Sequence, residues 1–165
     1  MKSYFRRYLY SILGALTYII IHEGVHIIQA KAFGVYEGIR VLPIGIEVLI
    51  AEPLRISGLK LASFSGLSSV ITIIIGYTLF IFTPKILKLN KQPIKNYLYY
   101  ATFAFLLIDP IYISLISFFV GGDINGISLG LNLSYITIRC IYFVIAIFNT
   151  YLVYKKLYPA YVIKQ

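Results

Sequence analysis

The sequence has little charge, little acid, one cysteine and two histidines. Only 13% of its 165 residues are charged, whereas soluble domains carry about 25% charged residues. This shortage argues against an ordinary soluble domain. The single cysteine, Cys140, excludes an internal disulfide. Cys140 lies within the predicted fourth span, so we expect it to be a small core residue.

Hydrophobic residues make up 59% of the chain and gather in long runs. Each run is at least as long as the ~20 residues that a helix needs to cross a ~30 Å hydrocarbon core. We therefore predict an all-α polytopic membrane protein with a single domain, residues 1–165. The first run is too long for a cleaved signal sequence, and no small-x-small pattern follows it. The predicted spans are 8–32, 61–83, 97–120 and 132–154.

The formal charge of +9 is better explained by the bilayer than by nucleic acid. The basic residues lie next to span ends, where they can anchor the chain at anionic headgroups. Four spans would place ten of them on the side that holds both termini, whereas Lys31, Arg40, Arg55 and Lys60 would lie opposite. The positive-inside rule then predicts cytoplasmic termini. We expect a multi-pass protein of the plasma membrane.

Residues 35–51 do not have a helical pattern. They are rich in β-branched residues, and Leu42-Pro43-Ile44-Gly45 supplies turn chemistry between two short runs. We predict a small β-hairpin at the membrane surface, with an irregular amphipathic link as the alternative. The start of the second span is rich in small residues that allow close helix approach, and we expect this half to pack on the first helix.

Both histidines lie in one pentapeptide of the first span, His22-Glu23-Gly24-Val25-His26. Residues four apart share a helix face, so the two imidazoles can converge on one metal ion. The His-Glu-x-x-His pattern is typical of zinc hydrolases, in which the glutamate is the general base. Gln29 shares the same face and is either an orienting residue or an interfacial one. The alternative is a buried polar cluster that joins helices.

A catalytic zinc site usually has three protein ligands, and the residues leave two candidates for the third. Asp109 lies in the middle of the third span and precedes Pro110, which kinks a helix and frees a carbonyl. Asp123 follows Gly121 and Gly122, which allow the backbone to bend sharply. Spacing alone does not decide between the two aspartates.

The chain resembles site-2-protease-like intramembrane zinc metalloproteases. The resemblance rests on the motif at residues 22–26, the Ala32-Phe33-Gly34 step into a β-rich segment, and the small-residue start of the second span. In that family a later span carries a proline and then an aspartate beside glycine, which is the third ligand. Asp123, downstream of Pro110, matches this element, although the family's Leu-Asp-Gly form is absent.

The resemblance implies an intramembrane zinc metalloendopeptidase. Zn²⁺ would be held by His22, His26 and Asp123, with Asp109 as the alternative third ligand, and Glu23 would be the general base. The substrate would be a transmembrane protein that unwinds locally and adds a strand to the hairpin edge. The alternative is a metal-binding membrane protein without proteolytic activity that acts as a regulator or partner subunit.

Overall fold

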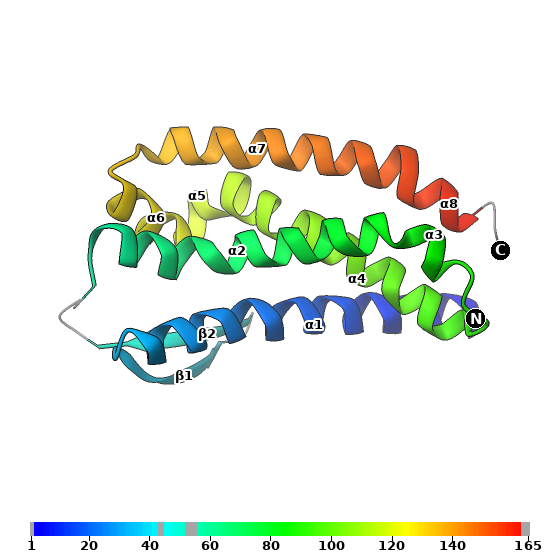
Figure 1. Ribbon diagram of the computed structural model, residues 1–165, viewed down its shortest axis with the longest axis horizontal. Helices are drawn as coiled ribbons and strands as arrows, with labels where there is room; N and C mark the ends of the chain where they lie inside the picture. The colour runs from blue at the N-terminus through cyan, green and yellow to red at the C-terminus, as the bar shows by residue number, and fades with distance from the viewer. Residues whose placement is uncertain (1, 43–44, 52–55, 163–165) are drawn as a thin grey trace.

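The computed structural model describes residues 2–42, 45–51 and 56–162 (Figure 1). It contains four helical segments that are long and apolar enough to cross a membrane. The prediction of an all-α, multi-pass protein with a small hairpin after the first helix is thus confirmed. The four segments are Phe5–Ala32, Gly58–Ile81, Gln92–Val120 and Tyr135–Val162.

Two of the spans are composite. The third joins α4, a π-helical turn and α5, and the fourth joins α7, a second π-helical turn and α8. The fourth span was predicted to end at residue 154, but the helical path continues to Val162. In chain order the elements are α1 (Lys2–Ala32), β1 (Tyr36–Leu42), β2 (Gly45–Ile50), α2 (Gly58–Ile81), α3 (Thr83–Ile86), α4 (Gln92–Ile111), η1 (Tyr112–Ile116), α5 (Ser117–Val120), α6 (Asp123–Leu131), α7 (Tyr135–Leu152), η2 (Val153–Leu157) and α8 (Tyr158–Val162).

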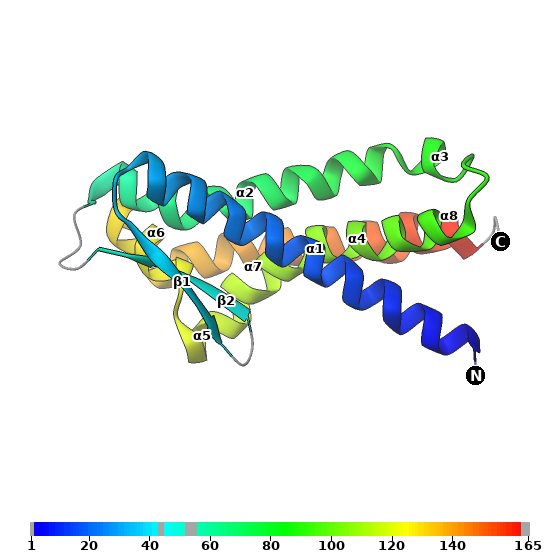
Figure 2. The same ribbon diagram turned by 90° about the horizontal axis from the view of Figure 1, so that it is seen from below.

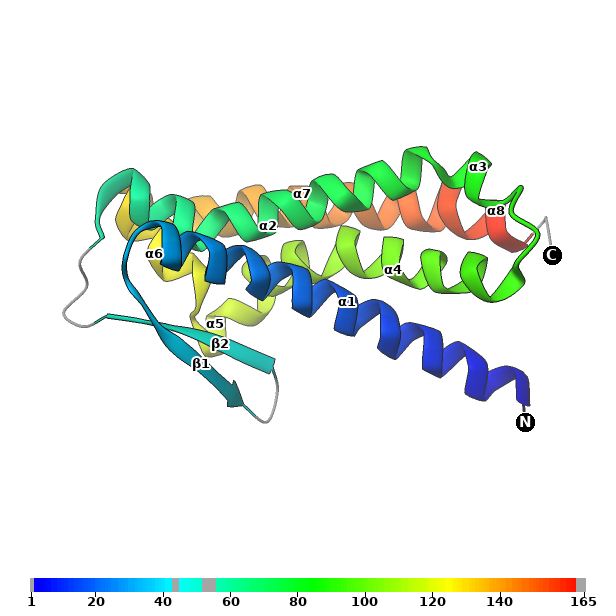
Figure 3. The same cartoon turned by 60° about the horizontal axis from the view of Figure 1, so that its bottom comes forward.

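The two ends of the bundle differ in content. Both termini and α3 lie at one end, whereas the hairpin and α6 lie at the other (Figure 1). The short helix α6 was not predicted, because the glycines around it indicated a link. Its N-terminal residue is Asp123, so the loop between α5 and α6 brings this aspartate back towards the bundle (Figure 3).

The hairpin projects from the bundle beside the C-terminal end of α1 (Figure 2). Strands β1 and β2 pair in antiparallel fashion, and opposite residues Arg40 and Glu47 form an exposed ion pair of 2.6 Å. The predicted turn residues Pro43 and Ile44 lie outside the described residues, as does the predicted break at 52–55. On its inner side, Val48 and Ile50 pack against a buried cluster that includes Phe64 of α2.

Glycines allow the long helices to approach closely. A Cβ at Gly14 of α1 would lie 2.9 Å from the backbone nitrogen of Ala101, and one at Gly76 of α2 would lie 3.0 Å from that of Leu106. Close backbone approach of this kind replaces the hydrophobic driving force that helices lack in lipid. Helix α4 is therefore the central helix against which α1 and α2 pack.

The start of α2 packs on α1, where Phe64 contacts His26, as expected, and its small residues also lie against α6. Ala62 and Ser65 lie against Gly130 and Gly126 of α6, where any Cβ would collide. Farther along α2, Ser69 faces the interior and contacts α4 through Asp109. Ser65 therefore allows α2 to pack closely on α6, and Ser69 makes a polar contact with α4.

The interior combines apolar clusters with buried polar side chains, and the outer surface carries many large apolar side chains. Thr72, Asp109 and Asn149 are fully buried, whereas large apolar side chains such as Phe119 face outwards. This distribution suits a hydrocarbon solvent. Cys140, expected to be a core residue, is exposed on α7, because its face of that helix points away from the bundle.

Asn149 repairs the helix break at Pro110. Proline has no N–H to donate to the carbonyl four residues earlier, which is that of Leu106. The Nδ2 of Asn149 donates to this carbonyl at 2.7 Å, and its Oδ1 accepts from the hydroxyl of Tyr77 at 2.6 Å. The kink in α4 is thus held from α7, and it sits one residue after Asp109.

Candidate metal centre

One face of α1 is polar and points into the bundle. His22 and His26 are 7% and 5% exposed, whereas Ile20 and Ile28 on the other face are 66% and 70% exposed. The spacing of four residues brings the two imidazoles together, and their Nε2 atoms lie 3.2 Å apart. The predicted convergence of the two side chains is therefore present in the structure.

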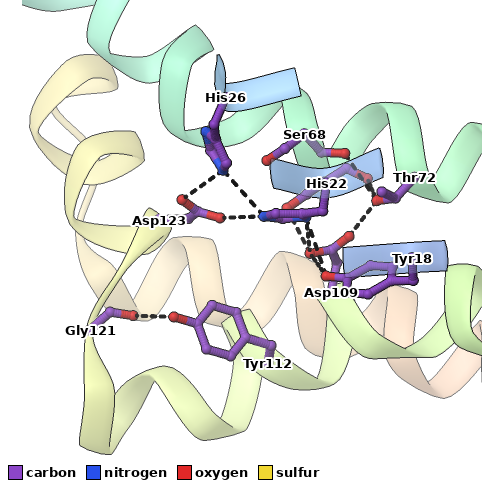
Figure 4. Close-up of polar contacts among 10 residues, drawn as sticks. Tyr18, His22, His26, Ser68, Thr72, Asp109, Tyr112, Gly121 and Asp123 are labelled. Atoms are coloured by element: carbon purple, nitrogen blue, oxygen red, sulfur yellow. Dashed lines mark hydrogen bonds and ion pairs between the residues drawn. The ribbon is translucent and has the colours of Figure 1, made fainter. Parts of the chain in front are cut away.

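Asp123 joins this pair from α6 (Figure 4). Its Oδ2 lies 3.2 Å from Nε2 of His22, and its Oδ1 lies 3.5 Å from Nε2 of His26. The three residues offer one ligand atom each within 4.8 Å of one another. No other such group of three is found in the described part of the chain.

These separations fit a tetrahedral zinc ion. Zn–N and Zn–O bonds of about 2.0–2.1 Å at tetrahedral angles place neighbouring ligand atoms about 3.3 Å apart. The measured values of 3.2, 3.2 and 3.5 Å surround this figure. Three ligands also leave a fourth position for water or substrate, as a catalytic site requires. The side chain of Asp123 is 17% exposed, so the cluster borders the protein surface.

The charge state of Asp123 also suits a ligand. Burial of a carboxylate raises its pKa, but the hydrogen bonds and charges of His22 and His26 outweigh burial and hold the pKa of Asp123 at about 2. The carboxylate is therefore ionised beside protonated imidazoles, and a metal ion that displaces their protons would supply the positive charge in their place.

A glycine turn presents Asp123. Gly121 and Gly122 have φ values of 71° and 84°, which side-chain-bearing residues rarely adopt. The hydroxyl of Tyr112 donates to the carbonyl of Gly121 at 3.2 Å, so the turn is tied to the helix that precedes it. Nearby, the guanidinium of Arg139 donates to the carbonyl of Ser117, the first residue of α5, at 3.2 Å and thereby ties α7 to this segment.

Asp109 does not belong to the group of three. It lies on the opposite side of the His22 ring, where its Oδ1 is 3.2 Å from Nδ1. The hydroxyl of Tyr18 donates to Asp109 at 2.7 Å and lies 3.3 Å from the same Nδ1. Ser69 and Thr72 of α2 also donate to this carboxylate. Tyr18, His22 and Thr72 are labelled around Asp109 in Figure 4.

The two aspartates therefore contact different nitrogens of the His22 ring, Asp109 at Nδ1 and Asp123 at Nε2. The Nδ1 of His22 faces two acceptors, the Asp109 carboxylate and the oxygen of Tyr18, so a neutral ring that binds a metal ion through Nε2 would carry its proton on Nδ1. The lone pair of Nε2 then faces His26 and Asp123. A carboxylate behind a histidine is the usual second partner of a metal-binding imidazole.

Two other buried polar atoms near the cluster lack hydrogen-bond partners among the described residues. His26 Nδ1 and Gln29 Oε1 are buried without a hydrogen-bond partner in the described part of the chain. Gln29 is thus a buried residue and not a solvated interfacial one. Glu23, next to His22, is half-buried and forms no side-chain hydrogen bond with the described residues. Its carboxylate is therefore not committed to another group.

Sequence reasoning missed several residues of the centre. Tyr18 could have been found, because it precedes His22 by four residues and so shares its face. Thr72 and Ser69 had a weaker signal, since they were interpreted as packing residues. Tyr112 and Arg139 had none, because their roles depend on the path of the turn before α6.

Comparison of the chain with protein-family models, with curated proteins and with solved structures finds no match. The function is therefore inferred from the residues of the site and their geometry.

Proposed function

We propose that the protein is an intramembrane zinc metalloprotease that cleaves a peptide bond in or near a transmembrane segment. The observation that carries this proposal is the convergence of His22, His26 and Asp123 with separations that suit tetrahedral zinc. An uncommitted carboxylate, Glu23, stands beside the first histidine. A site that only stores or carries metal has no need of such a base.

Zinc bound here would supply Lewis-acid polarisation of a scissile carbonyl and a more acidic water. Glu23 accepts a proton from the attacking water and returns it to the leaving amine. Asp109 and Tyr18 hold the proton of His22 on Nδ1 and fix the ring. Asp123 contributes the negative charge that completes the ligand set.

The substrate is proposed to enter as an extended strand. In the described residues β1 and β2 pair only with each other, which leaves a strand edge available for β-augmentation. Phe64 connects the hairpin to the centre, because it packs in the same cluster as Val48 and Ile50 and its ring lies 5.0 Å from that of His26. A strand bound at the hairpin would therefore lie close to the metal ligands.

We further propose that the protein lies in the plasma membrane with both termini in the cytoplasm. The end of the bundle that holds the termini is rich in lysine and arginine and has no acidic residue, as the positive-inside rule requires. This orientation places the hairpin and α6 towards the opposite side of the membrane.

The test is the substitution Glu23→Gln, which removes the base and leaves the three ligands in place. We expect purified wild type and variant to bind one zinc ion per chain. N-terminal proteomics of membranes from cells that express each protein should show new N-termini in or beside transmembrane segments. Their yield should fall about 100-fold or more in the variant, in line with the loss of a general base.

A matched control is Glu37→Gln, the same chemical change at an exposed position of β1, which should leave cleavage unchanged. Cleavage retained in Glu23→Gln would refute the role of this residue. Zinc binding with no new N-termini from the wild type would favour a non-proteolytic metal-binding regulator or partner subunit. Absence of zinc would refute both functions.

A further inference from the structure

A second site of different chemistry lies at the other end of the bundle. A cavity of about 700 Å³ opens between the first turns of α1, the start of α4 and helix α8. Helix α1 contributes Arg6, Arg7 and Tyr10 to its wall, and α4 contributes Gln92 and Asn96. The helix ends that form its wall lie at the end of the bundle that holds both termini, opposite the end with α6 (Figure 2).

The polar wall of this cavity combines arginines with tyrosine hydroxyls and two side-chain amides, all of which can donate hydrogen bonds. The guanidinium of Arg6 carries only donors, and the amide of Gln92 donates to Asn96 at 3.1 Å. Several tyrosines complete the wall. No acidic side chain forms an ion pair with Arg6 in the described part of the chain, and residues 1–22, 53–108 and 124–165 contain neither aspartate nor glutamate. The charge of the cavity therefore favours an anion.

Tyr161 provides an independent indication of a ligand. It lines the cavity, is 5% exposed, and its hydroxyl has no hydrogen-bond partner among the described residues. An unpaired buried hydroxyl costs about 1–3 kcal/mol. The ring is held in place by Tyr99, whose centroid lies 5.0 Å away. An acceptor bound in the cavity would satisfy this hydroxyl.

The position of the cavity indicates the kind of anion. Its walls come from the ends of three membrane-spanning segments, the depth at which lipid headgroups lie. Basic pockets between helices at this depth suit the phosphate of an anionic lipid. The fixed fork of an arginine also matches phosphate geometry.

We propose that this cavity binds the phosphate group of an anionic phospholipid headgroup. Arg6 pairs with the phosphate, and the hydroxyl of Tyr161 donates to one of its oxygens. The mixed polar and aromatic wall accommodates the rest of the headgroup. This site does not depend on the metal centre or on proteolysis.

The test measures lipid retention by the purified full-length protein with native mass spectrometry. Phosphatidylglycerol and phosphatidylcholine of equal chain length serve as probes. Wild type should retain phosphatidylglycerol preferentially. Arg6→Gln should weaken this retention about tenfold or more, because hydrogen bonds to charged groups are the strong ones. Tyr161→Phe should weaken it about twofold to tenfold.

Tyr161→Phe also separates a ligand role from a structural one. Without lipid, removal of an unpaired buried hydroxyl should leave the thermal midpoint unchanged or raise it. Two exposed residues at the same end supply matched controls, Lys88→Gln and Tyr154→Phe, and both should retain phosphatidylglycerol as the wild type does.

Wild-type retention in both Arg6→Gln and Tyr161→Phe would overturn the proposal, as would an equal loss in Lys88→Gln. Inorganic phosphate and glycerol 3-phosphate, added as competitors, distinguish the source of the phosphate. If millimolar concentrations of either displace the lipid, a soluble phosphate compound is the ligand and the lipid assignment is wrong. Absence of displacement supports the headgroup.

Discussion

Two aspartates meet His22 from opposite sides, and their surroundings differ. Asp109 lies inside the bundle, is 0% exposed and accepts hydrogen bonds from Tyr18, Ser69 and Thr72. Asp123 lies at the start of α6 beside a glycine turn, and its side-chain partners among the described residues are the two imidazoles. Asp109 thus accepts hydrogen bonds from three hydroxyl groups, whereas Asp123 contacts the histidines.

The contrast indicates how a single chain can use two similar residues for different tasks. A carboxylate that already accepts several hydrogen bonds is held rigidly, which suits it to orient a ring. A carboxylate with free lone pairs can bind a cation directly. The hydroxyls of α2 therefore matter to the centre, because they keep Asp109 from competing as a ligand.

Removal of Asp123 should have the largest effect on this contrast. In Asp123→Ala the centre loses a ligand and its negative charge, and two histidines alone bind zinc poorly. We expect zinc affinity to fall more than about 100-fold, a larger loss than is typical for residues that contact a metal ligand but not the metal. Competition with a chromophoric chelator in detergent measures the loss.

Glu47→Ala is a suitable control for this substitution, because it removes an exposed carboxylate of the hairpin and should leave zinc affinity unchanged. If Asp123→Ala binds zinc as the wild type does, Asp123 is not a ligand, and the distinction between the two aspartates fails.

Asp109→Asn should have a smaller effect. The amide keeps the shape of the side chain but lacks the charge that holds the proton of His22 on Nδ1. We expect zinc affinity to fall about 10- to 100-fold. Thr72→Val, which removes one donor to Asp109 without touching His22, should cost less than Asp109→Asn. An effect of Asp109→Asn as large as that of Asp123→Ala would indicate that both aspartates are ligands.

Much of the fold could be predicted from sequence because hydrophobic length and β-branched runs are local signals. The four spans and the hairpin follow from them. The extension of the fourth span to Val162 and the existence of α6 could not be predicted in the same way. Lys155, Lys156 and Pro159 interrupt the apolar pattern of the fourth span and hide its extension. The glycines before α6 indicate a turn but do not reveal the helix that follows.

The centre was predictable to the extent that it lies on one helix. His22 and His26 share a face by spacing alone. The choice between Asp109 and Asp123 was open, because both lie near the same depth and their difference is a matter of tertiary contacts. Tyr18, Ser69 and Thr72 converge on Asp109 from two helices, and no local pattern records that convergence.

Gly122→Ala should have the smallest effect of the three and tests the turn that presents Asp123. At φ 84° alanine is strained, at a cost of about 1–3 kcal/mol, and its Cβ would collide with the hydroxyl of Tyr112. The Tyr112 side chain can move away from the Cβ, but relief of the backbone strain requires the turn to move, and Asp123 moves with it. We expect zinc affinity to fall about tenfold, measured by the same chelator competition.

Gly24→Ala is the control, because Gly24 lies on α1 close to the ligands but has open space around it. The double variant with Tyr112→Phe removes the hydroxyl collision and should recover only part of the affinity, since the backbone strain remains. Full affinity in Gly122→Ala would show that the position of Asp123 does not depend on this turn. Helix α6 would then be the element that holds Asp123 on the side of His22 opposite Asp109.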